Sequence, residues 1–232
     1  MSDGIAEFAP EEIKAIVFDV DDTVTRGTLG IKTQAWDTIF NDRLDRLQEA
    51  RELYEYTGKG DRYNMIAHVL GEPQEGCVEN PKVIEWANKF ETEIQTNIRA
   101  GGIHADDLTA LIAIVEKYLG NVYLLSATPQ KSLEGNIEHF VTRYPELKYA
   151  FKRVMGTPFV NGKAGALADI ATENGYVPEE ILMVGDGGSD YKGAKGAGTQ
   201  FVGIKAGDDQ KWSEEQFPKV DAIAQLPELL AS

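Results

Sequence analysis

The sequence predicts an α/β fold, in which helices flank a parallel β-sheet and an all-helical module is inserted near the N-terminal end. Three observations support this prediction. Apolar segments of strand length alternate with amphipathic helical segments after residue 102. An apolar segment at residues 13–18 ends abruptly at a group of acidic residues. Residues 27–102 have helical periodicity and no convincing buried strand.

The first strand is expected at residues 13–18, where five of the six residues are apolar, as in strands buried on both faces. Asp19, Asp21 and Asp22 then lie at its carboxyl end, the edge where open α/β sheets bind ligands. In extended geometry Asp19 and Asp21 point to the same side and Asp22 points away. Two carboxylates in one pocket repel each other unless a cation neutralises them, and oxygen ligands suit Mg²⁺. We therefore expect a magnesium site.

The inserted module is expected to consist of helices separated by glycine-rich turns. The expected helices are residues 30–56, 62–70 with Asp61 as N-cap, and 81–100. The chain is thus divided into an α/β core, residues 1–26 and 103–232, and a helical cap, residues 27–102.

Strands and helices alternate in the remainder of the chain, which indicates a parallel sheet with right-handed crossovers. The expected helices are 105–119, 130–143, 163–175, a segment containing Ala194 and Ala197, and 226–230. The expected strands are 121–125, 151–155, 181–184 and 201–204.

Composition narrows the range of functions. The formal net charge of −15 repels polyanions, which argues against nucleic acid or an anionic membrane as a partner. The single cysteine, Cys77, excludes an intramolecular disulfide framework and fits a cytoplasmic protein. The sequence shows no signal peptide and no apolar run of about 18 residues. We expect a cytoplasmic monomer or homodimer.

Three further polar groups follow predicted core strands or begin the next helix. Ser126 follows the second strand, Lys163 begins the helix after the third, and Asp186 follows the fourth. Each has a plain structural explanation, because Ser126 could cap a helix, Lys163 could be solvated, and residues 185–188 could form only a turn.

Taken in order, these groups resemble the four motifs of the haloacid dehalogenase superfamily. The first motif is Asp19-Val20-Asp21-Asp22-Thr23, and the others contain Ser126, Lys163, and Gly185-Asp186 with Asp190. The resemblance spans residues 13 to about 207, and the insert resembles the cap of the phosphoglycolate phosphatase-like branch. It implies a Rossmann-like core. Two residues depart from that branch, since Asp22 stands where it commonly has Gly, and Gly187 where it commonly has Ser.

The resemblance also implies residue roles. Asp19 would attack phosphorus to form an aspartyl-phosphate, and Asp21 would act as general acid and then general base. Ser126 and Lys163 would contact the phosphoryl oxygens. The resemblance further implies that Mg²⁺ contacts Asp19, Asp186 and the backbone carbonyl of Asp21, with Asp190 in support, and that the substrate contacts Thr23, Ala127 and Thr128. In the insert, the turn at residues 58–62 carries two cations. Our hypothesis is that Lys59 or Arg62 holds the remote group of the substrate when the cap closes, and the alternative is that the turn is simply exposed.

The predicted function is therefore hydrolysis of a small phosphorylated metabolite by an Mg²⁺-dependent phosphatase. Asp21 favours phosphate over halide chemistry within the family, because a halide leaving group needs no proton. Three alternatives remain. They are a phosphomutase of the β-phosphoglucomutase type, a non-catalytic module that binds a phosphorylated ligand, and a receiver-like signalling module, which the length of the insert disfavours.

Overall fold

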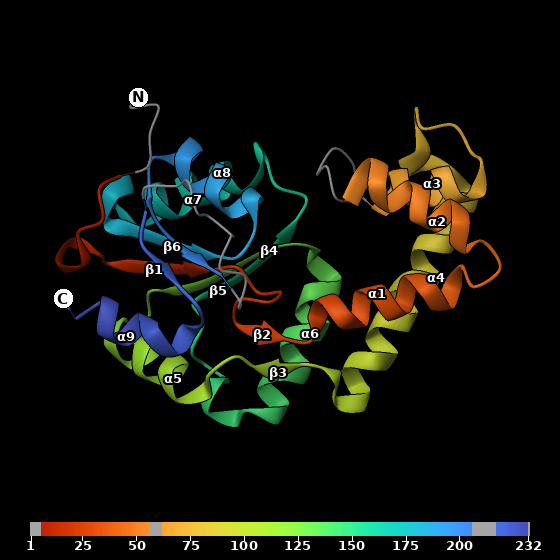
Figure 1. Ribbon diagram of the computed structural model, residues 1–232. Helices are drawn as coiled ribbons and strands as arrows, with labels where there is room; N and C mark the ends of the chain where they lie inside the picture. Colours follow the sequence, from red (N-terminus) through yellow and green to blue (C-terminus); the bar gives the residue numbers. More distant parts are fainter. Residues whose placement is uncertain (1–5, 56–61, 206–216, 232) are drawn as a thin grey trace. The chain divides into compact units, whose positions relative to one another are not determined.

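The computed structural model describes residues 6–55, 62–205 and 217–231 (Figure 1). The chain divides into two compact units, a core unit of Met1–Gly27 and Ile103–Ser232 and a helical unit of Thr28–Gly102. The predicted insert begins one residue earlier, at Gly27. Within the described ranges, no helix is long and apolar enough to span a bilayer.

The core unit contains a six-stranded parallel sheet with strand order β5-β4-β1-β6-β7-β8. β1 lies at its centre because all of its residues are apolar and buried, so both of its faces can be covered. Val17 of β1 pairs with Tyr123 on one side and with Met183 on the other. The strands are β1 (Ala15–Phe18), β4 (Val122–Pro129), β5 (Arg153–Thr157), β6 (Ile181–Gly185), β7 (Gln200–Ile204) and β8 (Lys219–Val220).

The parallel sheet of the prediction is confirmed, with two differences. The second strand extends four residues beyond the predicted end and includes Ser126, and the two-residue strand β8 was not predicted. β8 is too short to produce a periodic signal.

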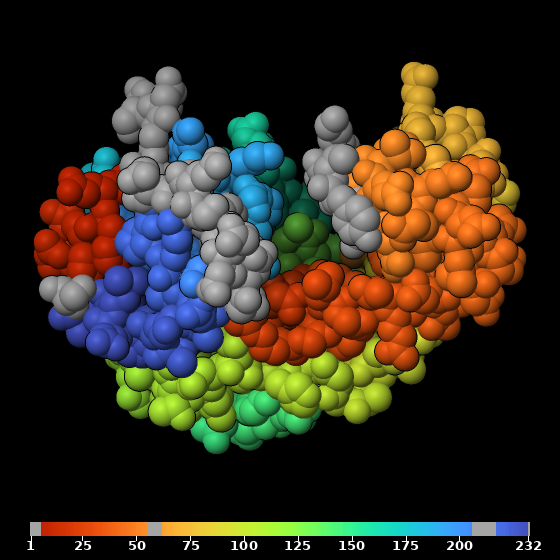
Figure 2. Space-filling model, viewed as in Figure 1, coloured from red at the N-terminus to blue at the C-terminus, as the bar shows by residue number. Residues whose placement is uncertain are grey.

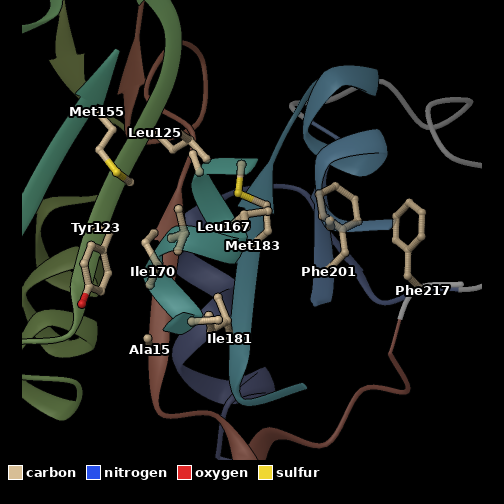
Figure 3. Packing of buried hydrophobic residues seen from close by; sticks show 14 residues of the cluster. Ala15, Tyr123, Leu125, Met155, Leu167, Ile170, Ile181, Met183, Phe201 and Phe217 are labelled. Carbon is tan, nitrogen blue, oxygen red and sulfur yellow. The ribbon is translucent and has the colours of Figure 1, made fainter. Parts of the chain in front are cut away.

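Helices connect the strands of the core, and the last helix follows the last strand. Their bounds are α5 (Leu108–Lys117), α6 (Gln130–Arg143), α7 (Gly162–Asn174), α8 (Gly188–Ala197) and α9 (Leu226–Leu229). Leu167 and Ile170 of α7 pack with Val17, Tyr123 and other alternate strand residues in one buried apolar cluster (Figure 3). This packing fixes the positions of α7 and α8 on the sheet. Each helix carries a charged residue in its first turn, Lys163 in α7 and Asp190 in α8.

The helical unit contains the α-helices α1 (Thr28–Ile39), α2 (Leu44–Ala50), α3 (Arg62–Leu70) and α4 (Pro81–Asn97). The single helix predicted for residues 30–56 is wrong, because the chain turns at 40–43 between α1 and α2. Phe40 at that turn is fully buried and stacks on Trp86 at 4.6 Å between ring centroids. Phe40 continues the helical spacing of apolar residues in the sequence although α1 has ended at Ile39, and this explains why the sequence predicts one helix. Figure 2 shows the atoms of the described residues of this unit in orange to yellow-green.

A short antiparallel ribbon in the core unit joins the two ends of the chain segment that carries the insert. It pairs β2 (Thr25–Arg26) with β3 (His104–Ala105). Arg26 forms an ion pair with Asp106, with 2.5 Å between Nε and Oδ1. Two-residue strands have no recognisable period, so the ribbon was not predicted.

Candidate active site

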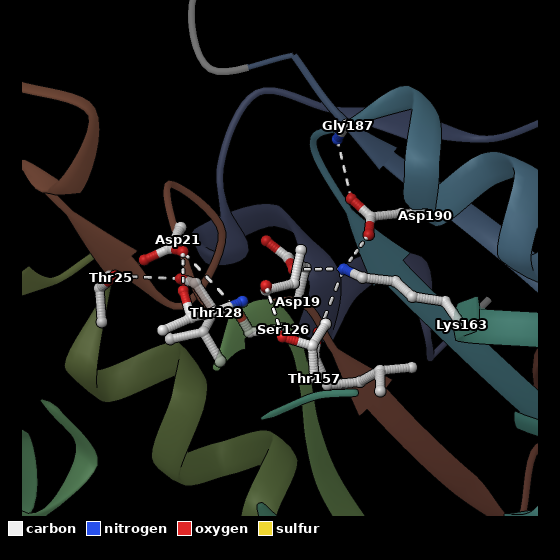
Figure 4. Close-up of polar contacts among 12 residues, drawn as sticks. Asp19, Asp21, Thr25, Ser126, Thr128, Thr157, Lys163, Gly187 and Asp190 are labelled. Carbon is white, nitrogen blue, oxygen red and sulfur yellow. Dashed lines mark hydrogen bonds and ion pairs between the residues drawn. The ribbon is translucent and has the colours of Figure 1, made fainter. Parts of the chain in front are cut away.

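The carboxyl ends of the central strands carry a buried ion-pair network (Figure 4). The Lys163 ammonium donates to Asp19 Oδ1 at 2.6 Å, to Asp190 Oδ1 at 2.5 Å and to the carbonyl of Leu125 at 3.2 Å. Less than a tenth of each charged side chain is exposed. Lys163 is therefore not the solvated helix-start residue of the plain structural explanation.

The backbone of this region allows that close approach. Lys163 lies in the first turn of α7, which packs against α8. A Cβ atom at Gly193 of α8 would lie 2.8 Å from the Lys163 Cβ, closer than two carbon atoms can approach without displacement. The absence of a side chain at Gly193 lets Lys163 reach Asp190, which is itself on α8.

Burial and mutual repulsion perturb the acids of this network. Burial raises the pKa of Asp19 well above its usual range, Lys163 opposes this shift, and the negative charges of Asp190 and Asp21 add to it. Burial also raises the pKa of Asp190, against the effect of Lys163. For Lys163, burial opposes the charge, but Asp19 and Asp190 outweigh it and raise its pKa, so the ammonium stays protonated.

The acidic side chains fit a divalent cation. Asp19, Asp186 and Asp190 place carboxylate oxygens within 4.8 Å of one another. Hard cations such as Mg²⁺ prefer oxygen ligands. The pKa of Asp19 is raised mainly by burial and further by the charges of Asp190 and Asp21, and a cation would relieve that repulsion. Asp190 has two other contacts, since its Oδ1 accepts from Lys163 and its Oδ2 from the Gly187 backbone N–H at 2.9 Å. Because both of its carboxylate oxygens already accept hydrogen bonds, Asp190 is suited to support a cation site formed by the other ligands.

Asp21 faces two hydroxyl groups from β4. Its Oδ2 accepts from Thr128 Oγ1 at 3.1 Å and lies 3.5 Å from Ser126 Oγ (Figure 4). Ser126 is buried within the strand and accepts from the Thr128 backbone N–H at 3.1 Å. It does not cap α6, which begins at Gln130.

The chain leaves the extended conformation soon after Asp19. Asp22 has a φ of 57°, in the left-handed region that Gly and Asp enter more easily than other residues. Its carbonyl accepts from Arg26 Nη1 at 2.6 Å. The expectation of an extended backbone through Asp22 is therefore wrong. The conformation also supplies a physical reason for Asp at a position where the resembled branch commonly has Gly.

The predicted substrate-contacting residues have different environments. Thr23 is fully buried, and its hydroxyl has no hydrogen-bond partner among the described residues. Ala127 is exposed, and its carbonyl accepts from Thr157 Oγ1 at 3.2 Å. Arg62 forms an ion pair with Glu91 inside the helical unit, with 3.1 Å between Nη1 and Oε2. Lys59 and the predicted cap Asp61 lie outside the described residues.

Sequence reasoning missed three residues around this site. Arg26 and Asp106 form the ion pair beside the ribbon, and their opposite charges on either side of the insert were an available signal. Gln130 bonds to the backbone of β5. A lone Gln at the start of a helix has no signal in the sequence that distinguishes it from a solvated residue.

Many solved structures have the same fold, and three of them, from two bacteria and one protozoan, are 13–16% identical to this chain, a level that shows the fold alone. The first is a HAD hydrolase of family IA, variant 3, from Entamoeba histolytica (13% identity, TM-score 0.70, covering 95% of this chain and 100% of that chain). The second is a predicted phosphoglycolate phosphatase from Haemophilus somnus (15% identity, TM-score 0.68, covering 94% of this chain and 98% of that chain). The third is a HAD family hydrolase from Deinococcus radiodurans with bound phosphate and sodium (16% identity, TM-score 0.64, covering 95% of this chain and 96% of that chain).

Comparison with curated proteins gives no match. The haloacid dehalogenase-like hydrolase family matches residues 13–198, a span that includes every motif residue described above. This span covers well over half of the chain, and the chain therefore belongs to the haloacid dehalogenase-like hydrolases.

Proposed function

We propose that the protein is an Mg²⁺-dependent phosphatase that hydrolyses small phosphorylated metabolites through an aspartyl-phosphate on Asp19. The observation that carries the proposal is the buried network in which Lys163 bonds to both Asp19 and Asp190, in a chain that belongs to a hydrolase family. The neighbours named as a phosphoglycolate phosphatase and as a phosphate-bound hydrolase support a phosphomonoester as the substrate class.

Asp19, Asp186 and the backbone carbonyl of Asp21 would hold the cation, with Asp190 in support. The oxygen donors and the crowding of negative charge fit this assignment. When bound there, Mg²⁺ would neutralise negative charge on the phosphoryl group and in the acidic pocket. Asp190 and Lys163 keep each other in place through their 2.5 Å contact.

In the first step a carboxylate oxygen of Asp19 attacks phosphorus, and the bond from phosphorus to the ester oxygen breaks. Asp21 protonates the departing oxygen, so an alcohol leaves and an aspartyl-phosphate remains. Lys163 and Ser126 face the charge that develops on the phosphoryl oxygens, Lys163 as a cation and Ser126 as a hydroxyl donor. The contact between Thr128 and Asp21 supports the orientation that proton transfer requires.

In the second step the Asp21 carboxylate takes a proton from a water molecule, which attacks phosphorus. The bond between phosphorus and the Asp19 oxygen breaks, which restores the carboxylate and releases inorganic phosphate. Asp21 thus returns to the protonated state in which it began. Arg62 and Lys59 remain proposed contacts of the substrate's remote group, and Thr23, Ala127 and Thr128 proposed contacts near the phosphate.

The proposal is tested by measuring phosphate release from a panel of phosphomonoesters, with Mg²⁺ and with excess chelator. We expect turnover with Mg²⁺ and its loss on chelation, because the acidic pocket repels an anionic substrate without a cation. The preferred ester will identify the substrate class. Failure of the metal-loaded chain to release phosphate from any ester, with interconversion of sugar phosphates instead, contradicts hydrolysis and favours a phosphomutase.

Stability should respond to Mg²⁺ in a pH-dependent way. Burial raises the pKa of Asp19 and Asp190, so the folded chain holds their protons more tightly than the unfolded chain. Their contribution to the free energy of unfolding therefore falls as pH rises through the raised pKa values. Mg²⁺ removes this loss, so the increase in Tm on adding Mg²⁺ should be larger at about pH 7.5 than at about pH 5. Differential scanning calorimetry checks this, with Asp19→Asn as the variant expected to show a smaller Mg²⁺ response.

A further inference from the structure

The irregular end of β4 brings its hydroxyl groups into the site. The strands β4 and β5 pair regularly up to Leu125 and Met155, and the next pair is Pro129 with Thr157. Three residues of β4 thus stand opposite the single Gly156 of β5. The extra residues bulge from the ladder, as in β-bulges that redirect side chains near functional sites. This bulge is the segment 126–128.

Gln130 bonds to two backbone groups of β5 beside this bulge. Its Oε1 accepts from the Gly156 backbone N–H at 2.5 Å, and its Nε2 donates to the Val154 carbonyl at 3.1 Å. The same Nε2 donates to Glu134 Oε1 at 2.8 Å. One side-chain amide therefore bonds to β5 where the β4 backbone has turned away.

Two further contacts hold the bulge closely against β5. Thr157 Oγ1 donates to the Ala127 carbonyl at 3.2 Å. A Cβ atom on Gly156 would lie 2.5 Å from the Thr128 carbonyl oxygen and 2.7 Å from the Gln130 Cα. Only glycine fits at residue 156 unless the bulge moves outward.

The bulge determines where the hydroxyl groups of Ser126 and Thr128 lie. Both lie near Asp21 Oδ2, Thr128 at 3.1 Å and Ser126 at 3.5 Å. Gln130 begins α6 two positions after the bulge, so its bonds to β5 hold the chain close to one end of the segment. Displacement of this end would move both hydroxyl groups relative to Asp21.

We propose that Gln130 is a positioning residue for the reaction, which acts through the bulge on Ser126 and Thr128. The inference rests on the proposed phosphatase function, in which these hydroxyl groups serve the phosphoryl group and the acid. Among the described residues, the hydrogen bonds of Gln130 go to Glu134, Val154 and Gly156, and none joins it to Asp19 or Asp21. Its effect on catalysis is through the backbone that it holds.

The test is Gln130→Met, which keeps the length of the side chain and removes both bonds to β5. We expect kcat/KM for the preferred phosphomonoester to fall about tenfold, because displacement of reacting groups by a fraction of an ångström is costly. Orthovanadate, which takes up the five-coordinate geometry of the transition state, should inhibit with a Ki about tenfold higher. Ki does not depend on the fraction of folded protein, so a loss of stability alone would leave it unchanged.

Two variants control this test. Glu134→Ala removes the helical contact of Gln130 and leaves its bonds to β5, so kcat/KM and the vanadate Ki should stay within about twofold of wild type. Gln130→Glu keeps an acceptor for Gly156 but no donor for Val154, so its losses should lie between those of wild type and Gln130→Met. Hydrogen exchange at the Gly156 amide should accelerate in Gln130→Met, which reports the lost bond independently of turnover.

The outcomes separate the two proposals. Hydrolysis and vanadate inhibition that are unchanged in Gln130→Met, while the wild type is active, overturn the positioning role and leave the phosphatase function intact. A wild-type chain that neither hydrolyses esters nor responds to vanadate overturns the phosphatase function and the positioning role together. An unchanged Gly156 exchange rate also overturns the positioning role, because the bond on which it rests would then be absent.

Discussion

Asp19→Asn should abolish ester hydrolysis, with a fall in kcat of about a thousandfold or more, because an amide cannot serve as the nucleophile. The same change should leave the metal-free Tm unchanged or higher. Burial raises the pKa of Asp19, and the charges of Asp190 and Asp21 add to that effect. Replacing the carboxylate with a neutral group relieves both effects, and Asp190 still pairs with Lys163. Phosphate release and calorimetry measure the two results.

The matched control is Asp169→Asn, which removes an exposed carboxylate from α7. It should retain hydrolysis and the Tm of the wild type, since an isolated surface charge contributes little. Substantial turnover by Asp19→Asn would contradict the nucleophilic role. A large drop in its metal-free Tm would contradict the electrostatic account of the site.

Lys163→Met should reduce both activity and stability. Removal of the ammonium leaves Asp19 and Asp190 buried without the cation that bonds to both. Loss of one partner from a buried ion pair costs about 3–5 kcal/mol of unfolding free energy. The expected fall in kcat is about a hundredfold to a thousandfold, because charge stabilisation of the transferred group is lost. Urea unfolding with and without Mg²⁺ and phosphate release give the two quantities.

The control for Lys163→Met is Lys14→Met in the same unit. Lys14 forms an ion pair with Glu180, and more than half of its side chain is exposed. Exposed pairs of this kind contribute about 1 kcal/mol or less, so this variant should unfold and hydrolyse nearly as the wild type does. The stability lost in Lys163→Met should be partly recovered at lower pH, where Asp19 and Asp190 gain protons readily because their pKa values are raised. If Lys163→Met and Lys14→Met lost the same free energy of unfolding, the claim that burial makes the Lys163 ion pairs stronger contributors than the exposed Lys14 pair would be contradicted.

Long apolar segments and strong helical periodicity made most of the core predictable. β1 and β6 are continuous apolar runs that end in Asp19 and Gly185-Asp186, so both their extent and their acidic ends are visible in the sequence. The break between α1 and α2 was missed because Phe40 continues the apolar pattern through the turn. Its burial against Trp86, 46 residues along the chain, is a tertiary contact that no local pattern contains.

The sequence by itself determined the alternation of strands and helices and the order of polar groups that follow them. Because parallel strands present their carboxyl ends at one edge, this order was enough to bring Asp19, Lys163, Asp186 and Asp190 together as candidates. The tertiary structure alone decided how they pair, with Lys163 between two acids, and where the hydroxyl groups of β4 point. The hydroxyl groups lie on the segment where the register of β4 shifts against β5, and Gln130 bonds to β5 beside that shift. Such contacts join residues more than twenty positions apart, and their geometry comes from packing, which has no counterpart in local sequence periodicity.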